Sequence, residues 1–583
     1  MLKTLLAQVK QYKKSSLLTP LFAALEVVME VLITFITAMI IDQGIEAGNM
    51  KKVGMYGSIM LVFAMFSLLF GVLAGKYAAN ASSGLACNLR DAMYENIQTF
   101  SFSNIDKYST AGLVTRMTTD VTNVQNAYQM ILRIAVRAPF TLICSMIMCF
   151  VINAKLSLIF VIAIIVLGAF IVVVVKTTMK IFDIVFKKYD ALNASVQENV
   201  SAIRVVKAFV REDYENKKFI TAAENVYKLF VKAEGILAFN GPVMMLVVYF
   251  CIICLSWFGV KFIVVGNMTT GELTSMFSYI MSILMSLMML SMIFVMTTLS
   301  IASGKRIAEV LNDKADLVNP KNPIMEVKNG SIDFNHVEFT YNDEAEKDTL
   351  IDIDLHIHSG ETVGIIGGTG CGKSSLVNLI SRLYDVNEGS VLVGGKDVKE
   401  YDLEVLRNQV AVVLQKNVLF SGTILENLRW GNETATKEEC IEACKNACAD
   451  EFIERFPNKY ETYIEQGGSN VSGGQKQRLC IARALLKKPQ ILILDDSTSA
   501  VDTATDAKIR SVFAKKIPDT TKIIIAQRIS SVQDADRILV LDDGKINGFD
   551  THENLLKTNE IYQEIYNTQV KGGGDFDQTG GAK

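Results

Sequence analysis

Residues 361–384 read ETVGIIGGTGCGKSSLVNLISRLY, and they define the architecture of the second half of the chain. The apolar start predicts a buried strand, and SSLVNLI predicts a helix. Between them, Gly367-Gly368-Thr369-Gly370-Cys371-Gly372-Lys373-Ser374 fits a phosphate-binding loop in its required strand–loop–helix context. Glycines let backbone N–H groups close around phosphates at a helix N-terminus. We therefore expect Lys373 to reach the β- and γ-phosphates of a nucleotide, and the Ser374 hydroxyl to ligate Mg²⁺.

Two further motifs follow this loop. A second apolar strand, ILIL at 491–494, ends in Asp495-Asp496, where a carboxylate is placed to hold Mg²⁺ through water. The intervening segment is long enough for an inserted helical subdomain. It contains Val471-Ser472-Gly473-Gly474-Gln475 directly before the helical pattern KQRLCIARALL, which predicts another anion site. Because one ATP carries one γ-phosphate, a second such site suggests a nucleotide shared between two subunits.

The composition indicates a membrane part joined to a soluble part. The 583 residues are 50% hydrophobic and 20% charged, with a mean hydropathy of +0.29, which is too apolar for an ordinary soluble protein. A net charge of −3 gives no support for a nucleic-acid partner. The cysteines form no disulfide framework, so we expect a reducing cytoplasm around the soluble part. Cys440, Cys444 and Cys448 fit a buried helical stripe better than a metal site.

Six apolar runs in the first half are long enough to cross a bilayer, which needs about 20 residues each. They lie at 17–41, 54–78, 130–153, 156–176, 239–264 and 272–300. Short loops join every second pair of spans, whereas long segments with helical patterning join the others. The second long segment is rich in Lys and Arg. Basic loops stay cytoplasmic, so we place both long connections and both termini in the cytoplasm.

Ionisable residues occur within these spans. Glu26 and Glu30 lie in the first span, and Arg133 and Arg137 lie near the inner end of the third. Such residues at membrane depth are functional candidates, and a structural ion pair is the alternative. The sixth span is rich in methionine, which forms adaptable surfaces, although helix packing explains the same pattern. Its methionines are Met276, Met281, Met285, Met288, Met289, Met292 and Met296.

Taken together, these motifs resemble a half-transporter of the ATP-binding cassette (ABC) exporter family over nearly the whole chain. The resemblance implies a membrane all-α domain of six transmembrane helices, followed by an α/β P-loop ATP-binding cassette domain. We expect the transmembrane domain at 1–315, a linker at 316–328, the nucleotide-binding domain at 329–568 and a flexible Gly-rich tail at 569–583. Segments 102–121 and 205–219 look like the two cytoplasmic coupling regions. The family fold also implies a dimer with two sandwiched ATP molecules.

The resemblance assigns further site residues. Tyr341 matches the aromatic that stacks on adenine, and Gln415 matches the glutamine that touches Mg²⁺. Ser499 and Asp502 match the loop that crosses the dimer interface. The implied ATP-binding set is Tyr341, Gly367, Gly368, Thr369, Gly370, Cys371, Gly372, Lys373, Ser374, Ser375, Gln415 and Asp495, with Ser374, Gln415 and (through water) Asp495 at Mg²⁺. Val471, Ser472, Gly473, Gly474 and Gln475 are expected to contact ATP in the partner's site.

Several positions depart from the family pattern. Asp496 stands where a glutamate usually orients the attacking water, and Gln527 stands where a switch histidine is usual. Gln466 replaces a glutamate before the signature, whose usual leucine is Val471. One methylene less withdraws the carboxylate by more than about 1 Å, whereas a general base works within about 2.6–3.2 Å. Gln527 still donates a hydrogen bond but carries no charge. We therefore expect ATP binding with weak hydrolysis at this chain's own site.

This pattern resembles the degenerate chain of heterodimeric bacterial ABC exporters. The alternatives are a homodimer in which Asp496 suffices, an importer with the exporter fold, and an ATP-gated regulatory subunit. The implied partners are a second half-transporter with an intact catalytic site, the lipid bilayer, and an amphipathic small molecule, either a drug or a lipid. The implied cofactors are ATP and Mg²⁺. The implied location is the bacterial plasma (inner) membrane, with the nucleotide-binding domain in the cytoplasm.

Overall fold

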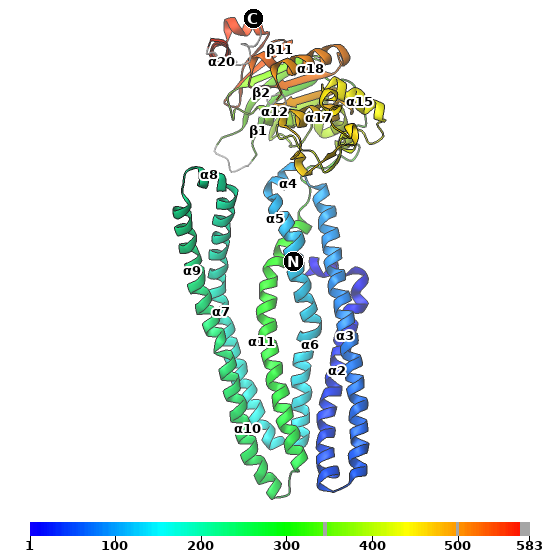
Figure 1. The fold of residues 1–583 in the computed structure, drawn as a ribbon, viewed down its shortest axis with the longest axis vertical. Coiled ribbons are helices and arrows are strands. Elements are labelled where there is room, and N and C mark those ends of the chain that lie inside the picture. Colours follow the sequence, from blue (N-terminus) through cyan, green and yellow to red (C-terminus); the bar gives the residue numbers. More distant parts are fainter. Residues whose placement is uncertain (342–346, 497–500, 572–583) are drawn as a thin grey trace. The chain divides into compact units, whose positions relative to one another are not determined.

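The computed structural model describes residues 1–341, 347–496 and 501–571, and the chain divides into two units (Figure 1). One unit comprises Met1–Gln98 and Ser109–Asp313, and the other comprises Thr99–Tyr108 together with the chain from Lys314 onward. The first unit is helical, and the second contains the β-sheets.

Six helices in the described part of the chain are long and apolar enough to cross a membrane, which confirms the predicted six-span fold. Large apolar side chains such as Leu68 and Ile165 are 61% and 65% exposed along them, as expected of surfaces that lipid covers. The spans fall within α2 (Lys13–Met39), α3 (Met50–Thr99), α6 (Val121–Ile152), α7 (Ala154–Ser201), α10 (Asn240–Val264) and α11 (Thr270–Asn312).

The long connections are helical, as predicted from their sequence. α3 has 50 residues and α7 has 48, so each continues well beyond the roughly 20 residues that a bilayer requires. α7 lies alongside α9 (Glu212–Ala238), and the short α8 (Ile203–Ala208) joins them (Figure 1). The remaining elements of this unit are α1 (Leu2–Ala7), η1 (Lys10–Tyr12), η2 (Ile40–Glu46), α5 (Thr110–Thr115) and η3 (Arg116–Asp120).

A six-stranded sheet in the order β12-β11-β3-β10-β9-β6 organises the second unit. All neighbours pair in parallel except β12, which is antiparallel to β11. β9 and β10 are buried at every residue, which explains their continuous apolar sequences. The strands are β3 (Thr362–Gly367), β6 (Val410–Val413), β9 (Ile491–Asp495), β10 (Thr521–Ile525), β11 (Arg537–Asp542) and β12 (Lys545–Asp550).

A second, antiparallel sheet has the order β2-β1-β4-β5. Its strands are β1 (Ile332–Phe339), β2 (Leu350–Ile357), β4 (Glu388–Val393) and β5 (Lys396–Asp397). The helices of the unit are α12 (Lys373–Ile380), α13 (Leu403–Gln409), α14 (Ile424–Arg429), α15 (Lys437–Asn446), α16 (Asp450–Ile453), α17 (Gly473–Leu485), α18 (Thr503–Lys516), α19 (His552–Thr558) and α20 (Glu560–Lys571). The predicted burial of Cys440, Cys444 and Cys448 is confirmed, because all three lie in the core formed around these helices.

The contact-based units differ from the predicted domain boundaries at two places. Residues 99–108, which we assigned to the transmembrane domain, cluster with the second unit, where Asn104 Nδ2 in α4 (Phe102–Lys107) donates to the Lys314 carbonyl over 3.0 Å. The tail predicted from residue 569 is helical up to Lys571, because α20 packs onto the core through Ile561 and Ile565. The glycine-rich segment 572–583 lies outside the described residues.

Candidate ATP-binding site

Four neighbouring parallel strands, β3, β10, β9 and β6, end at the same edge of the six-stranded sheet. Their register pairs Ile525 with Ile365 on one side and with Asp495 on the other. Ligands of such sheets bind at the carboxyl ends of the strands. A pocket of about 550 Å³ lies at this edge. Its lining includes Tyr341, Gly367, Gly368, Thr369, Gly370, Gly372, Lys373, Ser374, Ser375, Gln415, Asp495, Asp496, Gln527 and Ile565. Side chains far apart in sequence therefore meet as the motifs suggested, and their roles stay predictions.

The loop after β3 suits a phosphate. Gly370 and Gly372 have φ values of 84° and 98°, a left-handed conformation that L side chains rarely adopt. Gly372 is the N-cap of α12, so the helix begins at Lys373 and its first N–H groups face the loop. Lys373 Nζ donates to the carbonyls of Gly367 and Gly368 over 2.9 and 2.7 Å. Cys371 differs from its neighbours, because its side chain is buried and does not line the pocket.

Tyr341 is fixed at the rim of the pocket. Its hydroxyl donates to Ser375 Oγ over 3.0 Å, and its ring lies edge-on to those of Phe339 and Tyr384, at centroid distances of 4.8 and 5.0 Å. The side chain is nevertheless 51% exposed. A held but accessible aromatic ring is what stacking on a nucleobase requires.

Tyr384 joins this rim to α4 within the same unit. Its hydroxyl donates to Asp106 Oδ2 over 2.6 Å, and the Phe102 ring lies edge-on at 6.0 Å. Burial raises the pKa of Tyr384, and the hydrogen bond to Asp106 raises it further. The hydroxyl therefore remains a donor at neutral pH. Residues 102–107 belong to the first predicted coupling region, so an aromatic contact links the expected adenine position to that region.

Asp495 and Asp496 end the buried strand β9. Burial raises the pKa of Asp495, and the neighbouring charge of Asp496 adds to this, whereas the Ser374 hydroxyl and Lys373 oppose it. Ser374, Gln415 and Asp495 line the same pocket and offer only oxygen ligands for a cation, which is the set that Mg²⁺ prefers. The residues present thus fit the ion, which when bound neutralises phosphate charge.

Asp496 and Gln527 are hydrogen-bonded to each other. Gln527 Nε2 donates to Asp496 Oδ2 over 2.8 Å, and the Asp496 N–H donates to the carbonyl of Ile525 on the adjacent strand over 3.1 Å. Asp496 is only 9% exposed and has a φ of 47°. Two of the four residues that depart from the family pattern therefore form one amide–carboxylate pair, and both line the pocket beside Asp495.

Gln569 is a site-associated residue that the sequence reasoning missed. Its Nε2 donates to the Gln527 carbonyl, and its Oε1 accepts from the Ile529 N–H, both over 2.8 Å. The last helix thereby holds the loop that carries Gln527, and Ile565 of the same helix lines the pocket. The spacing of Ile561 and Ile565 was the available signal, because apolar residues four apart indicate a packed helix face.

The signature residues do not line this pocket. Ser472 caps α17 by accepting from the Gln475 N–H, and Gln475 Oε1 accepts in return from the Ser472 N–H. Ser472 and Gly473 are exposed, whereas the Val471 side chain is buried in the core. Gln466 is also exposed, within η6 (Gln466–Gly468).

The interface-loop residues are described only in part. The side chain of Asp502 caps α18 by accepting from the Thr505 N–H over 2.9 Å, and this hydrogen bond lowers the pKa of Asp502. Ser499 lies outside the described residues.

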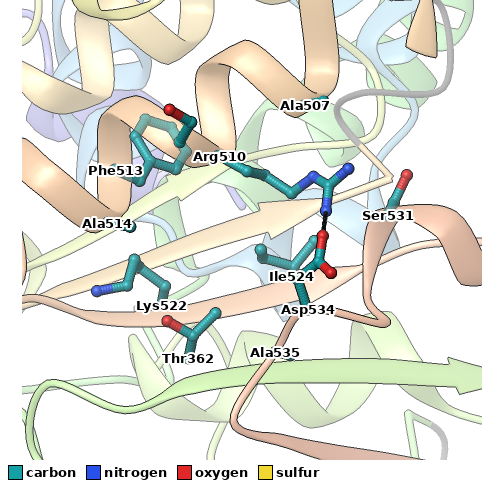
Figure 2. Close-up of a pocket in the computed structure, with 11 residues that line it drawn as sticks. Thr362, Ala507, Arg510, Phe513, Ala514, Lys522, Ile524, Ser531, Asp534 and Ala535 are labelled. Carbon is teal, nitrogen blue, oxygen red and sulfur yellow. Dashed lines mark hydrogen bonds and ion pairs between the residues drawn. The ribbon is translucent and has the colours of Figure 1, made fainter. Parts of the chain in front are cut away.

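A second pocket, of about 240 Å³, lies between α18 and the sheet, where Thr362 of β3 and Lys522 and Ile524 of β10 line it (Figure 2). Arg510 is paired with Asp534 at 2.9 Å, and Lys522 Nζ donates to three backbone carbonyls. Because Arg510 is ion-paired with Asp506 and Asp534 and Lys522 is held by backbone carbonyls, we assign this pocket no ligand.

Comparison with known proteins agrees with this geometry. The family model described as ABC transporter transmembrane region matches residues 16–288, and the model described as ABC transporter matches residues 350–499. This chain belongs to the ABC transporter family: it carries a transmembrane region and an ATP-binding ATPase domain.

Relatives match along nearly the whole chain. The uncharacterized ABC transporter ATP-binding protein YfiB of Bacillus subtilis is 37% identical over 544 residues, which cover 93% of this chain and 94% of the relative. The ATP-dependent lipid A-core flippase of Desulfotalea psychrophila is 32% identical, covering 88% and 89%. The structure of a bacterial Atm1-family ABC exporter with ATP bound superposes with a TM-score of 0.83, at 24% identity, over 96% of this chain and 99% of the other. The predicted fold class is thus confirmed.

Proposed function

We propose that this chain is the degenerate-site half of a heterodimeric ABC exporter that moves amphipathic small molecules, drugs or lipids, out across the bacterial plasma membrane. The Gln527–Asp496 hydrogen bond carries the proposal. A carboxylate engaged by an amide is poorly placed to activate water, and glutamine has no titratable proton to pass on. The site is then built to hold ATP and to hydrolyse it slowly.

The partner half follows from the exposed signature. Ser472 and Gly473 begin α17 on a surface apart from the chain's own pocket, and a helix start with free N–H groups binds anions. In the proposed complex these residues complete the partner's site, where an intact glutamate and histidine support hydrolysis. Ser374, Gln415 and Asp495 hold Mg²⁺ with the ATP of this chain.

In the proposed cycle, ATP clamps the two cassettes together and the membrane helices open outward, which lowers the affinity for substrate. Hydrolysis at the partner's site resets the pair, while the degenerate site keeps its ATP longer. Six of the seven methionines of the last span are between 42% and 62% exposed, so α11 offers an apolar, adaptable surface to an amphipathic substrate. The proposed location is the inner membrane, with both termini and the cassette in the cytoplasm.

The test compares this chain alone with the chain co-purified with its partner half. We expect weak Mg²⁺-ATP hydrolysis alone and strong hydrolysis together. In inside-out vesicles, we expect the pair to accumulate a fluorescent amphipathic cation when ATP is added. Full hydrolysis by the chain alone would instead establish the homodimer, and efflux from such vesicles would establish import.

A further inference from the structure

A cluster of four charged residues lies between α2 and α6 in the membrane unit. Arg137 forms ion pairs with Glu26 and Glu30, with Nη1–Oε1 and Nη2–Oε1 distances of 3.0 and 2.6 Å. The structural ion pair considered for these residues is therefore present. This pairing gives Arg137 two carboxylate partners and satisfies the Oε1 atom of Glu26 and of Glu30.

The cluster leaves two groups without partners. Glu26 is 7% exposed, and its Oε2 atom has no hydrogen-bond partner among the residues that the structure describes. Arg133, one turn before Arg137 on α6, is partly buried and has no ion pair with any described residue. An unsatisfied buried polar atom destabilises the fold, and more so when it is charged. Ionisable groups without partners at membrane depth are typical of functional sites.

Two glycines of α3 make room for both groups. A Cβ atom at Gly71 would lie 3.0 Å from Glu26 Oε1, and one at Gly75 would lie 3.7 Å from Arg133 Nη1. Gly71 and Gly75 are four residues apart, about 6 Å along the helix axis. The carboxylate and the guanidinium therefore lie beside successive turns of the same glycine surface without forming an ion pair with each other.

An apolar surface lies at the same level of the unit. Tyr279 Oη donates to the carbonyl of Val31 over 2.9 Å, and Ser275 Oγ donates to that of Thr34, also over 2.9 Å, so α2 and α11 run antiparallel. Continuing this register by about one and a half turns brings Met285 to the level of Glu26. Met285 is 62% exposed. Met285 thus offers an exposed apolar side chain at the same depth as the charged groups.

We propose that Glu26 and Arg133 recognise the zwitterionic head of an amphipathic substrate, specifically a phospholipid with a primary ammonium group. The ammonium donates to Glu26 Oε2, and Arg133 holds the phosphate, for which its planar guanidinium is suited. The inference rests on the proposed export function, whose substrate class it specifies.

The test measures ATP-dependent translocation of acyl-labelled phospholipids by the transporter pair in proteoliposomes. The labelled probes carry ethanolamine, choline or glycerol head groups. We expect the ethanolamine lipid to move about tenfold faster than the other two, because choline has no N–H donor and glycerol has no cation. Equal rates for the three lipids with the unaltered protein would overturn the inference without any substitution.

Substitutions then test which residue binds the ammonium group of the lipid and which binds its phosphate. Glu26→Gln is expected to abolish the preference for ethanolamine over glycerol, whereas Arg133→Gln slows all three lipids by about 10- to 100-fold and Arg133→Lys partly restores them. Lys155→Gln removes an exposed charge at the start of α7 and serves as the control, with rates like those of the unaltered protein. Retained ethanolamine preference in Glu26→Gln would contradict the site.

The same vesicles separate this inference from the proposed function. If the pair exports an amphipathic dye but moves the three lipids equally, the recognition site is wrong and the exporter stands. If neither dye nor lipid moves with ATP, the proposed export function itself is wrong.

Discussion

Gln527 donates a hydrogen bond from Nε2 to Oδ2 of Asp496 over 2.8 Å, so the two unusual residues of the site engage each other. They meet because β9 and β10 are adjacent parallel strands whose ends are in register, with Ile525 opposite Asp495. Gln569 restrains the backbone next to this pair, because it donates to the Gln527 carbonyl and accepts from the Ile529 N–H. Under the proposed function, this arrangement favours retention of ATP over its hydrolysis.

Lys373→Ala should weaken ATP binding at this chain's site by at least about tenfold, because one charge-assisted contact to phosphate is lost. Titration of the co-purified pair with a fluorescent ATP analogue measures the change. The variant should bind one analogue molecule tightly, whereas the unaltered pair binds two. Lys396→Ala, an exposed lysine on β5, is the control and should bind normally. Unchanged stoichiometry in Lys373→Ala would show that the loop after β3 does not hold the nucleotide.

Gln569→Ala should loosen the loop that carries Gln527, because two hydrogen bonds of about 0.5–1.5 kcal/mol each are removed. Hydrogen exchange at the Ile529 amide should accelerate about tenfold while the sheet strands keep their protection. Gln563→Ala, on the same helix, leaves these bonds intact and should exchange like the unaltered chain. Equal exchange at Ile529 in both variants would mean that α20 does not restrain the loop.

Tyr384→Phe should lower transport per ATP hydrolysed about three- to tenfold, because it removes the hydrogen bond to Asp106 while the ring still packs against Tyr341. ATP binding should stay normal. Dye transport and hydrolysis, measured on the same vesicles, give the ratio. Tyr463→Phe changes an exposed hydroxyl elsewhere in the cassette and should leave the ratio unaltered. A normal ratio in Tyr384→Phe would remove this contact from the coupling route.

Glu361→Gln should destabilise the cassette at neutral pH. Burial alone would raise the pKa of Glu361, but hydrogen bonds from Arg537 and from the His358 N–H outweigh it and lower the pKa. A lowered pKa stabilises the fold above the ordinary glutamate value of about 4.3, and this contribution is lost as the pH falls further.

The expected cost of that substitution is about 2–3 kcal/mol, or a fall of roughly 4–12 °C in the melting temperature of the cassette. Thermal unfolding of the full chain, followed by circular dichroism at neutral and acid pH, measures it. The difference from the unaltered chain should shrink below about pH 4.3. Glu388→Gln, an exposed carboxylate on β4, should have little effect at either pH. A pH-independent difference would contradict the ion-pair explanation.

The sequence predicted best what local patterns encode. Apolar length alone revealed the six spans, and the glycine-rich loop between strand and helix located the pocket. Sequence patterns did not predict specific contacts between segments that are distant in the chain. The family resemblance marked residues 102–121 as a coupling region, but the individual contacts of Asn104 with Lys314 and of Tyr384 with Asp106 appear only in the folded unit.

The role of Gln569 was not predicted from the sequence for a related reason. It sits beside a glycine-rich segment whose composition suggested a flexible tail, although Ile561 and Ile565 anchor its helix. Likewise, the sequence placed Arg133 and Arg137 equally at membrane depth. Only the fold distinguishes the paired Arg137 from the unpartnered Arg133 among the described residues.

The central claim is that Asp496 and Gln527 make this chain's own site slow. The most direct measurement is Mg²⁺-ATP hydrolysis by the complex with its partner half, in which the partner's catalytic base has been removed. We predict near-background hydrolysis, and a rise of about 10²-fold or more when Asp496→Glu and Gln527→His are introduced together. A complex that already hydrolyses ATP rapidly, and that gains nothing from the two substitutions, would contradict the account.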